Sequence, residues 1–242
     1  NVTNNGALGL GFASGISGMN LSNSEMALIT GDLNLINGSI TAATGTSLNL
    51  TGNLVIGKSC GSITGQGAMT LAATNGLVID SSINSSGNLA LDGDSNNSSE
   101  TSDGIALASG VSLTSSGGTI TLDATNGGVT APGALALTAA GALNLNDNFT
   151  ASGPITIKSS GLTIGGTTLS SGTASTTILT SAAGTTMGLC GAVCSGSFGL
   201  SITSTDFAKI SAGSLIIGDS TNGTVSYTHL RAHETEADHV CR

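Results

Sequence analysis

The sequence lacks tryptophan and has one tyrosine, two prolines and only five lysine or arginine residues among its 242. Nucleic acids and anionic membrane surfaces attract clustered basic side chains, so a chain with a formal net charge of −9 is not expected to bind either. No apolar run approaches the ~18 residues of a membrane-spanning helix, so we expect no membrane span. The scarcity of proline favours strands inside a hydrogen-bonded ladder, where each N–H is needed.

Charged residues make up only 8% of the chain, and aromatic residues 2%. Such a composition can indicate disorder, but 38% of the residues are hydrophobic and the mean hydropathy is +0.31. Leucine and isoleucine then supply enough apolar area to offset chain entropy. We therefore expect a folded protein with a thin aliphatic core and with Ser, Thr and Asn, in place of charged residues, on its outer faces.

Glycine is abundant, with 37 residues, and many of these glycines precede a short run of alternating aliphatic residues. The clearest stretch is 133–165, in which Gly133, Gly141, Gly153 and Gly161 each precede such a run. Alternation at period 2 places the aliphatic side chains on one face of an extended strand. Very short strands joined by turns and repeated many times are typical of a solenoid.

The glycines also recur regularly. Matching glycines fall at 52, 67 and 87, and again at 118, 133 and 153, so the two triplets share one short and one long interval. This alternation predicts coils of two lengths, each with two or three short strands. Such coils are typical of a parallel β-helix, whereas a propeller would need a period of about 40 residues. The sequence therefore predicts an all-β parallel β-helix of about ten coils.

A longer repeat brackets the body of the chain. Residues 21–30 (LSNSEMALIT) align with 202–211 (ITSTDFAKIS), and after a one-residue shift residues 33–35 match 215–217. In the first pair of segments Glu25 and Asp206 occupy equivalent positions after Ser/Thr-rich turns. We expect these two carboxylates to help cap a turn and not to take part in chemistry.

The Gly-x-Leu-x-Leu coils and the unit at 201–218 (SITSTDFAKISAGSLIIG) resemble the repeat region of filamentous-haemagglutinin-like exoproteins, over residues ~20–225. The resemblance implies a right-handed parallel β-helix exported by two-partner secretion through an outer-membrane transporter. It also implies an extended adhesin stalk, secreted or attached to the cell surface of a Gram-negative bacterium, with host-cell surfaces, glycans or other extracellular matrix as partners. We expect residues 1–225 to be such a repeat segment, as a fragment of a longer protein.

Residues 226–242 (SYTHLRAHETEADHVCR) differ from the rest, with no glycine, all three histidines and the only tyrosine. They resemble the translated sequencing-adapter tail of some assembled open reading frames, and we expect them to be foreign to the native protein. His229, His233, His239 and Cys241 carry ligand atoms that suit zinc, and the first two would share a helix face. Because the glutamate of the HExxH motif is missing, we interpret these residues as part of a foreign tail and not as a zinc site.

The other three cysteines are Cys60, Cys190 and Cys194. In an exported protein we expect a local disulfide between Cys190 and Cys194. Their spacing is CxxxC and not CxxC, which argues against a redox motif. Cys60 has no partner once Cys241 is set aside, and we expect it to be a free thiol.

The densest acidic stretch, 92–104, is expected to be an insertion loop that protrudes from one coil. Asp92, Asp94, Asn96 and Asp103 fall at positions 1, 3, 5 and 12 of a calcium-loop spacing, with Glu100 at position 9. Oxygen ligands at these positions could hold Ca²⁺. The stretch lacks glycine at position 6 and a glutamate at position 12, so a solvated loop is the competing and favoured interpretation.

Parallel β-helices also include polysaccharide lyases and hydrolases, which need clustered carboxylates or basic groups near the substrate. Asp123 and Asp147 follow strands on neighbouring coils and could stack. Outside the tail the basic residues are Lys58, Lys158 and Lys209. We therefore expect a non-catalytic stalk segment without a cofactor, with a polysaccharide-degrading enzyme or a calcium-binding surface-layer-like repeat protein as the alternatives.

Overall fold

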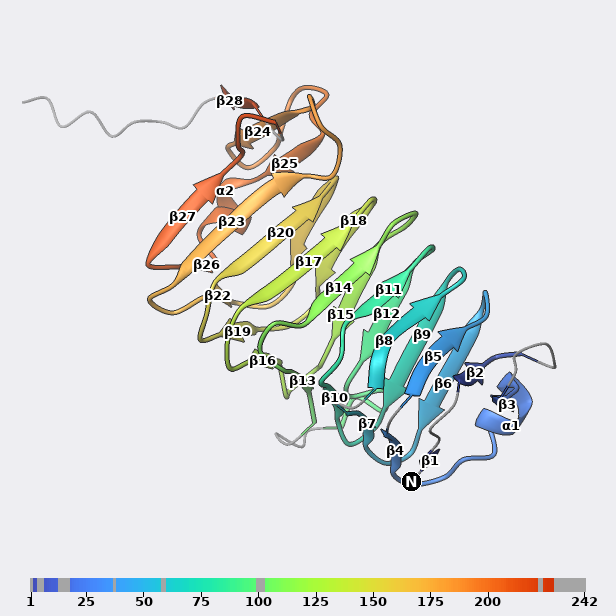
Figure 1. Cartoon of the computed structure of the whole chain (residues 1–242). Helices are drawn as coiled ribbons and strands as arrows, with labels where there is room; N and C mark the ends of the chain where they lie inside the picture. The colour runs from blue at the N-terminus through green and yellow to red at the C-terminus, as the bar shows by residue number, and fades with distance from the viewer. Residues whose placement is uncertain are drawn as a thin grey trace, which may run out of the picture.

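The computed structural model describes residues 2–3, 7–12, 18–36, 38–57, 60–98, 103–221 and 224–228. These residues form short strands that stack side by side into an elongated body, from the N-terminal coils to the C-terminal ones (Figure 1). Each strand pairs in parallel with its equivalent on the next coil, so the fold is an all-β parallel β-helix, as the sequence predicts. No helix in the described part of the chain is long and apolar enough to cross a membrane.

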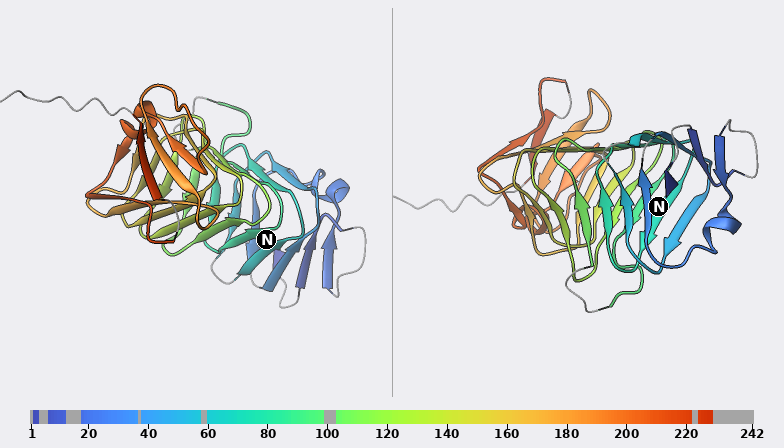
Figure 2. Two further views of the ribbon diagram at one scale, coloured as in Figure 1. Left: turned by 90° about the horizontal axis from the view of Figure 1, so that it is seen from above. Right: turned by 60° about the horizontal axis from the view of Figure 1, so that its bottom comes forward.

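Three long sheets run along the body, and a short fourth sheet lies near the C-terminal end (Figures 1 and 2). Sheet A contains, in spatial order, β1 (Val2–Thr3), β4 (Leu33–Ile36), β7 (Leu54–Ile56), β10 (Leu77–Ile79), β13 (Ile105–Leu107), β16 (Val129–Ala131), β19 (Phe149–Ala151), β22 (Leu169–Ser170) and β26 (Ile210–Ser211). Sheet B contains β3 (Gly18–Leu21), β2 (Ala7–Leu10), β5 (Gly38–Ala42), β8 (Cys60–Gly65), β11 (Ile83–Ser85), β14 (Ser112–Ser115), β17 (Leu135–Ala139), β20 (Ile155–Ser159), β23 (Ser175–Thr180) and β27 (Ser214–Ile217).

Sheet C contains β6 (Thr46–Leu50), β9 (Met69–Ala73), β12 (Leu89–Asp92), β15 (Ile120–Asp123), β18 (Ala142–Leu145) and β21 (Gly161–Ile164). The short sheet D contains β25 (Leu200–Ile202), β24 (Thr186–Cys190) and β28 (Thr224–Thr228). From β4 to β21 the chain visits sheets A, B and C in turn, so each coil of this region has three strands.

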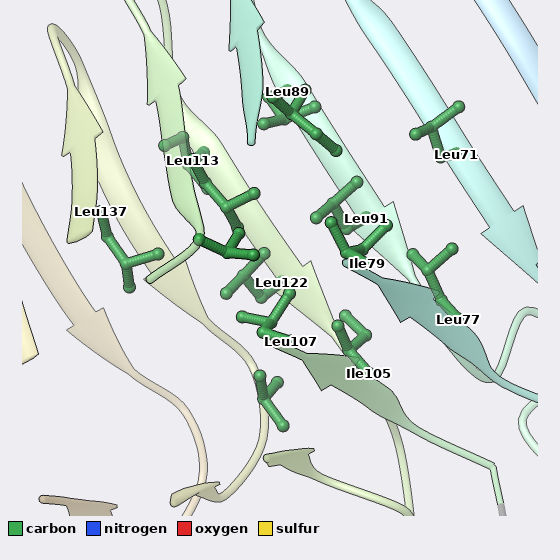
Figure 3. Packing of buried hydrophobic residues seen from close by; sticks show 14 of the residues in the cluster. Leu71, Leu77, Ile79, Leu89, Leu91, Ile105, Leu107, Leu113, Leu122 and Leu137 are labelled. Atoms are coloured by element: carbon green, nitrogen blue, oxygen red, sulfur yellow. The ribbon is translucent and has the colours of Figure 1, made fainter. Parts of the chain in front are cut away.

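The core is the stack of aliphatic side chains that the three sheets point inward. In β10, Leu77 and Ile79 are fully buried while Val78 between them is partly exposed. The same alternation buries Leu89 and Leu91 of β12, and Figure 3 shows these side chains from different sheets packed against one another. Period-2 alternation therefore decides which face of each strand meets the core.

The prediction of a second, shorter coil length is wrong. Val129 pairs with Phe149 and Phe149 with Leu169, so these coils have the length of the longer predicted coil. The coil that carries the acidic loop is longer still, because Leu77 pairs with Ile105 on the far side of that loop. The longer glycine interval is thus one full coil, and the shorter interval joins positions on different faces.

The stacking of the glycines explains this error. A Cβ added at Gly153 would lie 2.5 Å from the carbonyl carbon of Gly133, so these two glycines, separated by the longer interval, stack directly. Gly118 instead lies beneath Gly141, whose added Cβ would be 3.0 Å from the carbonyl carbon of Gly118. Glycines precede strands in more than one sheet. The intervals between them therefore include both the length of one full coil and the distance between strands of two different sheets.

The bracketing repeat forms two capped helical turns, α1 (Asn23–Met26) and α2 (Ser204–Phe207). Glu25 accepts a hydrogen bond from the backbone N–H of Ser22 in a capping box, and the side chain of Thr203 caps α2 by accepting from the N–H of Asp206. The capping role predicted for the Glu25 carboxylate is confirmed, whereas the Asp206 carboxylate contributes indirectly, by accepting a 2.7 Å hydrogen bond from the hydroxyl of the capping residue Thr203. The aligned strands beyond the turns differ, because 33–35 lie in sheet A and 215–217 in sheet B.

Candidate functional site

The outer face of sheet C carries a line of polar side chains across successive coils. The inward positions of its strands are aliphatic, so the alternate residues project outward. In register along this line lie Asn49, Ala72, Asp92 and Asp123, and the amide of Asn146 on the next coil donates a 2.8 Å hydrogen bond to Asp123 Oδ2. Carboxylates and amides therefore stack one coil apart.

Burial and repulsion between neighbouring carboxylates disfavour the ionised form of the aspartates on this face. Burial raises the pKa of Asp92, and the charges of Asp123 and Asp94 raise it further, while a hydrogen bond from the N–H of Asp94 acts in the opposite direction. Burial likewise raises the pKa of Asp147, again with contributions from Asp123 and Asp94. These four residues belong to one acidic cluster, although their positions in the sequence suggest two separate pairs.

A signal for the Asp92–Asp123 pairing is present in the sequence. Each aspartate is the last residue of its strand, after the alternating residues LAL in β12 and ITL in β15, and so occupies an equivalent position. The sequence left open whether Asp147 stacks with Asp123. Asp147 lies one residue beyond the register partner of Asp123, which is Asn146, and Asn146 makes the contact.

The acidic loop after β12 is held by its own hydrogen bonds. Asp94 and Asp103 are each only 1% exposed. Asp94 Oδ1 accepts a 3.0 Å bond from the N–H of Ser98, and Asp103 Oδ2 accepts a 2.9 Å bond from the Ser98 hydroxyl. Asn126 from the following coil donates to the carbonyl of Ser98. The carboxylates thus fix the loop against its neighbours.

Three of the calcium candidates, Asp94, Asn96 and Asp103, accept hydrogen bonds from Ser98. Asp92 accepts from the N–H of Asp94, and Asn96 accepts from the N–H of Ser98, so both face partners within the loop. In the ranges that the structure describes, no group of three or more His, Cys, Asp or Glu side chains is arranged to hold a metal ion. Glu100 lies outside the described residues.

Cys190 and Cys194 form a disulfide with an S–S distance of 2.02 Å and a Cα–Cα distance of 5.1 Å. Beside it, Leu189, Ile202 and Phe207 line a small apolar pocket of about 110 Å³. The side chain of Cys60 and the tail residues with the zinc-type ligands, His229, His233, His239 and Cys241, lie outside the described residues.

The basic residues do not accompany the carboxylates. Lys158 lies on β20 of sheet B, and Lys209 Nζ donates to the carbonyl of Ile164 at the end of β21. Lys58 is outside the described residues. The outer face of sheet C thus presents hydrogen-bonding and acidic groups. Among the residues that the structure describes, no lysine or arginine lies beside the Asp92–Asp123 pair.

Searches with family models, against curated proteins and against solved structures gave no match.

Proposed function

We propose that the chain is a stalk segment of a secreted or surface-attached bacterial adhesin, and that its role is structural and not catalytic. The observation that supports this proposal is the continuity of the sheets. Sheet B runs through ten strands without a break in parallel pairing, and each coil lengthens the body by about 4.8 Å. A body built in this way places groups at one end far from groups at the other.

The surface and the disulfide agree with a position outside the cell. Outward positions of the strands are mostly Thr, Ser and Asn, which hydrate well without bringing charge. A disulfide such as Cys190–Cys194 persists in oxidising compartments. The secretion route and the host-surface partners come from the resemblance to filamentous-haemagglutinin-like exoproteins and belong to the same proposal.

Two assays on the purified chain test the proposal. We expect binding to epithelial cells or extracellular matrix, and no release of reducing ends or unsaturated products from acidic polysaccharides. If the chain cleaved such a polysaccharide, and Asp92→Asn or Asp123→Asn abolished the cleavage, the protein would be an enzyme and the proposal of a non-catalytic stalk would be wrong. Thr163→Ala, on the same sheet face but away from the acidic cluster, is the matched control.

A further inference from the structure

A polar groove lies on the outer face of sheet C at its N-terminal end. Its floor is the outward row of β6 and the residue that follows, Ser47, Asn49 and Thr51. Asn23 of helix α1 and Ala27, the residue that caps its C-terminal end, form one wall, and Thr74 and Ser95 form the other. The groove has a volume of about 430 Å³, within the range of ~300–1,000 Å³ found for small-molecule sites.

Both walls are fixed in place by hydrogen bonds. Asn23 Nδ2 donates to the carbonyl of Gly45, and Asn23 Oδ1 accepts from the N–H of Ser47, so α1 is held over the start of β6. On the other side, the N–H of Ser95 donates to the carbonyl of Ala73, and its hydroxyl donates a 3.1 Å bond to Asn49 Oδ1. The acidic loop thus reaches back two coils to close the groove.

The floor keeps hydrogen-bonding capacity for a ligand. Asn49, which lines the groove, uses its oxygen to accept from Ser95, and its amide N–H groups are not used in that bond. Thr51 Oγ1 accepts from the N–H of Gly31, so its own hydroxyl proton is available. Within the described residues, the hydroxyl of Ser47 makes no hydrogen bond to the protein, and Ser47 and Asn49 are both exposed.

The chemistry of the lining selects the ligand class. All seven lining residues are uncharged, and six carry a hydroxyl or an amide group. Such groups donate and accept, as sugar hydroxyls do, while Ala27 and the threonine methyl groups offer apolar contact to the C–H face of a sugar ring. A net charge of −9 disfavours sulfated or sialylated ligands.

We propose that this groove binds a neutral oligosaccharide. The proposal rests on the stalk function, because it supplies a surface-displayed segment with a ligand class. It differs from that function in assigning the contact to one site, defined by α1, β6 and the turn at Ser95.

The test is a glycan array probed with the whole chain, followed by titration calorimetry with the best neutral oligosaccharide. We expect Asn49→Ala to weaken binding about tenfold or more, a loss of ~1.4 kcal/mol. Ala27→Arg should also weaken binding, because its side chain fills the groove while the bonds that hold both walls remain. Thr163→Ala, at an exposed outward position of β21, should bind as the unmodified chain does. Thermal melts establish that each variant is folded.

The outcomes separate this proposal from the stalk function. Binding only to sulfated or sialylated glycans, or binding that survives both Asn49→Ala and Ala27→Arg, would overturn the groove assignment. Cell binding without any neutral-glycan binding would also overturn it and leave the stalk function intact. Glycan binding accompanied by cleavage would support the groove and overturn the non-catalytic stalk.

Discussion

Asp92 and Asp123 are register partners on the adjacent strands β12 and β15, so their carboxylates project from sheet C one coil apart. Like charges directly opposite each other on neighbouring strands destabilise a sheet, by about 0.2–1 kcal/mol. Two hydrogen bonds to the Asp123 carboxylate partly compensate, one of 2.8 Å from Asn146 on the next coil and one of 3.1 Å from Thr125, two residues along the chain.

Replacing Asp92 with asparagine should stabilise the protein at neutral pH. The pKa of Asp92 is raised in the folded state, so the folded protein binds more protons than the unfolded chain in the range just above the usual aspartate pKa of about 3.9. Stability therefore falls as pH rises through that range. Asp92→Asn removes this loss, and we expect a gain of about 0.2–1 kcal/mol at pH 7 that shrinks towards pH 4. Urea unfolding at both pH values measures it, and a loss of stability at pH 7 would contradict the prediction.

Asp32 should show the opposite pH dependence. The N–H and side-chain amide of Asn53 donate to its carboxylate, and these bonds lower the pKa of Asp32. Its contribution to stability is present above the usual aspartate pKa and is lost as pH falls through the lowered value. Asp32→Asn should therefore lower the melting temperature at pH 7, with a smaller effect in strong acid. An equal effect at all pH values would contradict the assignment.

The fold could be predicted from the sequence because the period-2 aliphatic pattern acts locally. Spacing alone places Leu135 and Leu137 on one face of a strand, and both are buried. Coil length was not predictable in the same way. Glycines precede strands in different sheets, and their spacing does not indicate to which sheet each strand belongs. Coil length follows from the strand register, and the register is set by pairing between residues that are distant in the sequence.

The candidate sites depended on that register. The acidic loop lies between Asp92 and Asp123 and lengthens their coil, so the regular glycine interval does not bring these two residues together. The polar groove needed a further fact, since Ser95 meets Asn49 across two coils. No local pattern in the sequence specifies such a contact, whereas the capping role of Glu25 is local and could be predicted.

The inner hydroxyls at the end of the sheet B strands allow a sharp test of packing. Ser115 Oγ donates a 2.6 Å bond to the carbonyl of Gly87, whereas Ser159 Oγ is buried without a partner among the described residues. An unsatisfied buried hydroxyl costs ~1–3 kcal/mol. Ser159→Ala should therefore leave stability unchanged or raise it by up to about 1 kcal/mol, while Ser115→Ala should lower it by about 1 kcal/mol. Equal losses in both variants by urea unfolding would refute this distinction.

The disulfide should stabilise the C-terminal coils modestly. Cys190 and Cys194 have a sequence separation of 4, and cross-linking so short a loop removes only about 2 kcal/mol of chain entropy from the unfolded state. The double variant Cys190→Ala/Cys194→Ala should therefore lose up to about 2 kcal/mol. A reducing agent should shift the unmodified chain by the same amount and leave the double variant unchanged. Hydrogen exchange should place the loss in sheet D, and a loss spread evenly over all sheets would contradict a local role.

Stacked glycines should be the least tolerant positions in the turns. A Cβ at Gly153 would lie 2.5 Å from the carbonyl carbon of Gly133 and 2.6 Å from the backbone nitrogen of Ala134, and backbone atoms of a stacked coil cannot yield as a side chain can. We expect Gly153→Ala to lower the free energy of unfolding by about 1–3 kcal/mol or more, as overpacking does. Gly161→Ala is the matched control, since its nearest contact is the Cβ of Ala142 at 3.4 Å, and it should change stability by less than about 1 kcal/mol. If urea unfolding gave equal losses for the two variants, the coils would have to separate at Gly133 far more easily than their parallel hydrogen bonds allow.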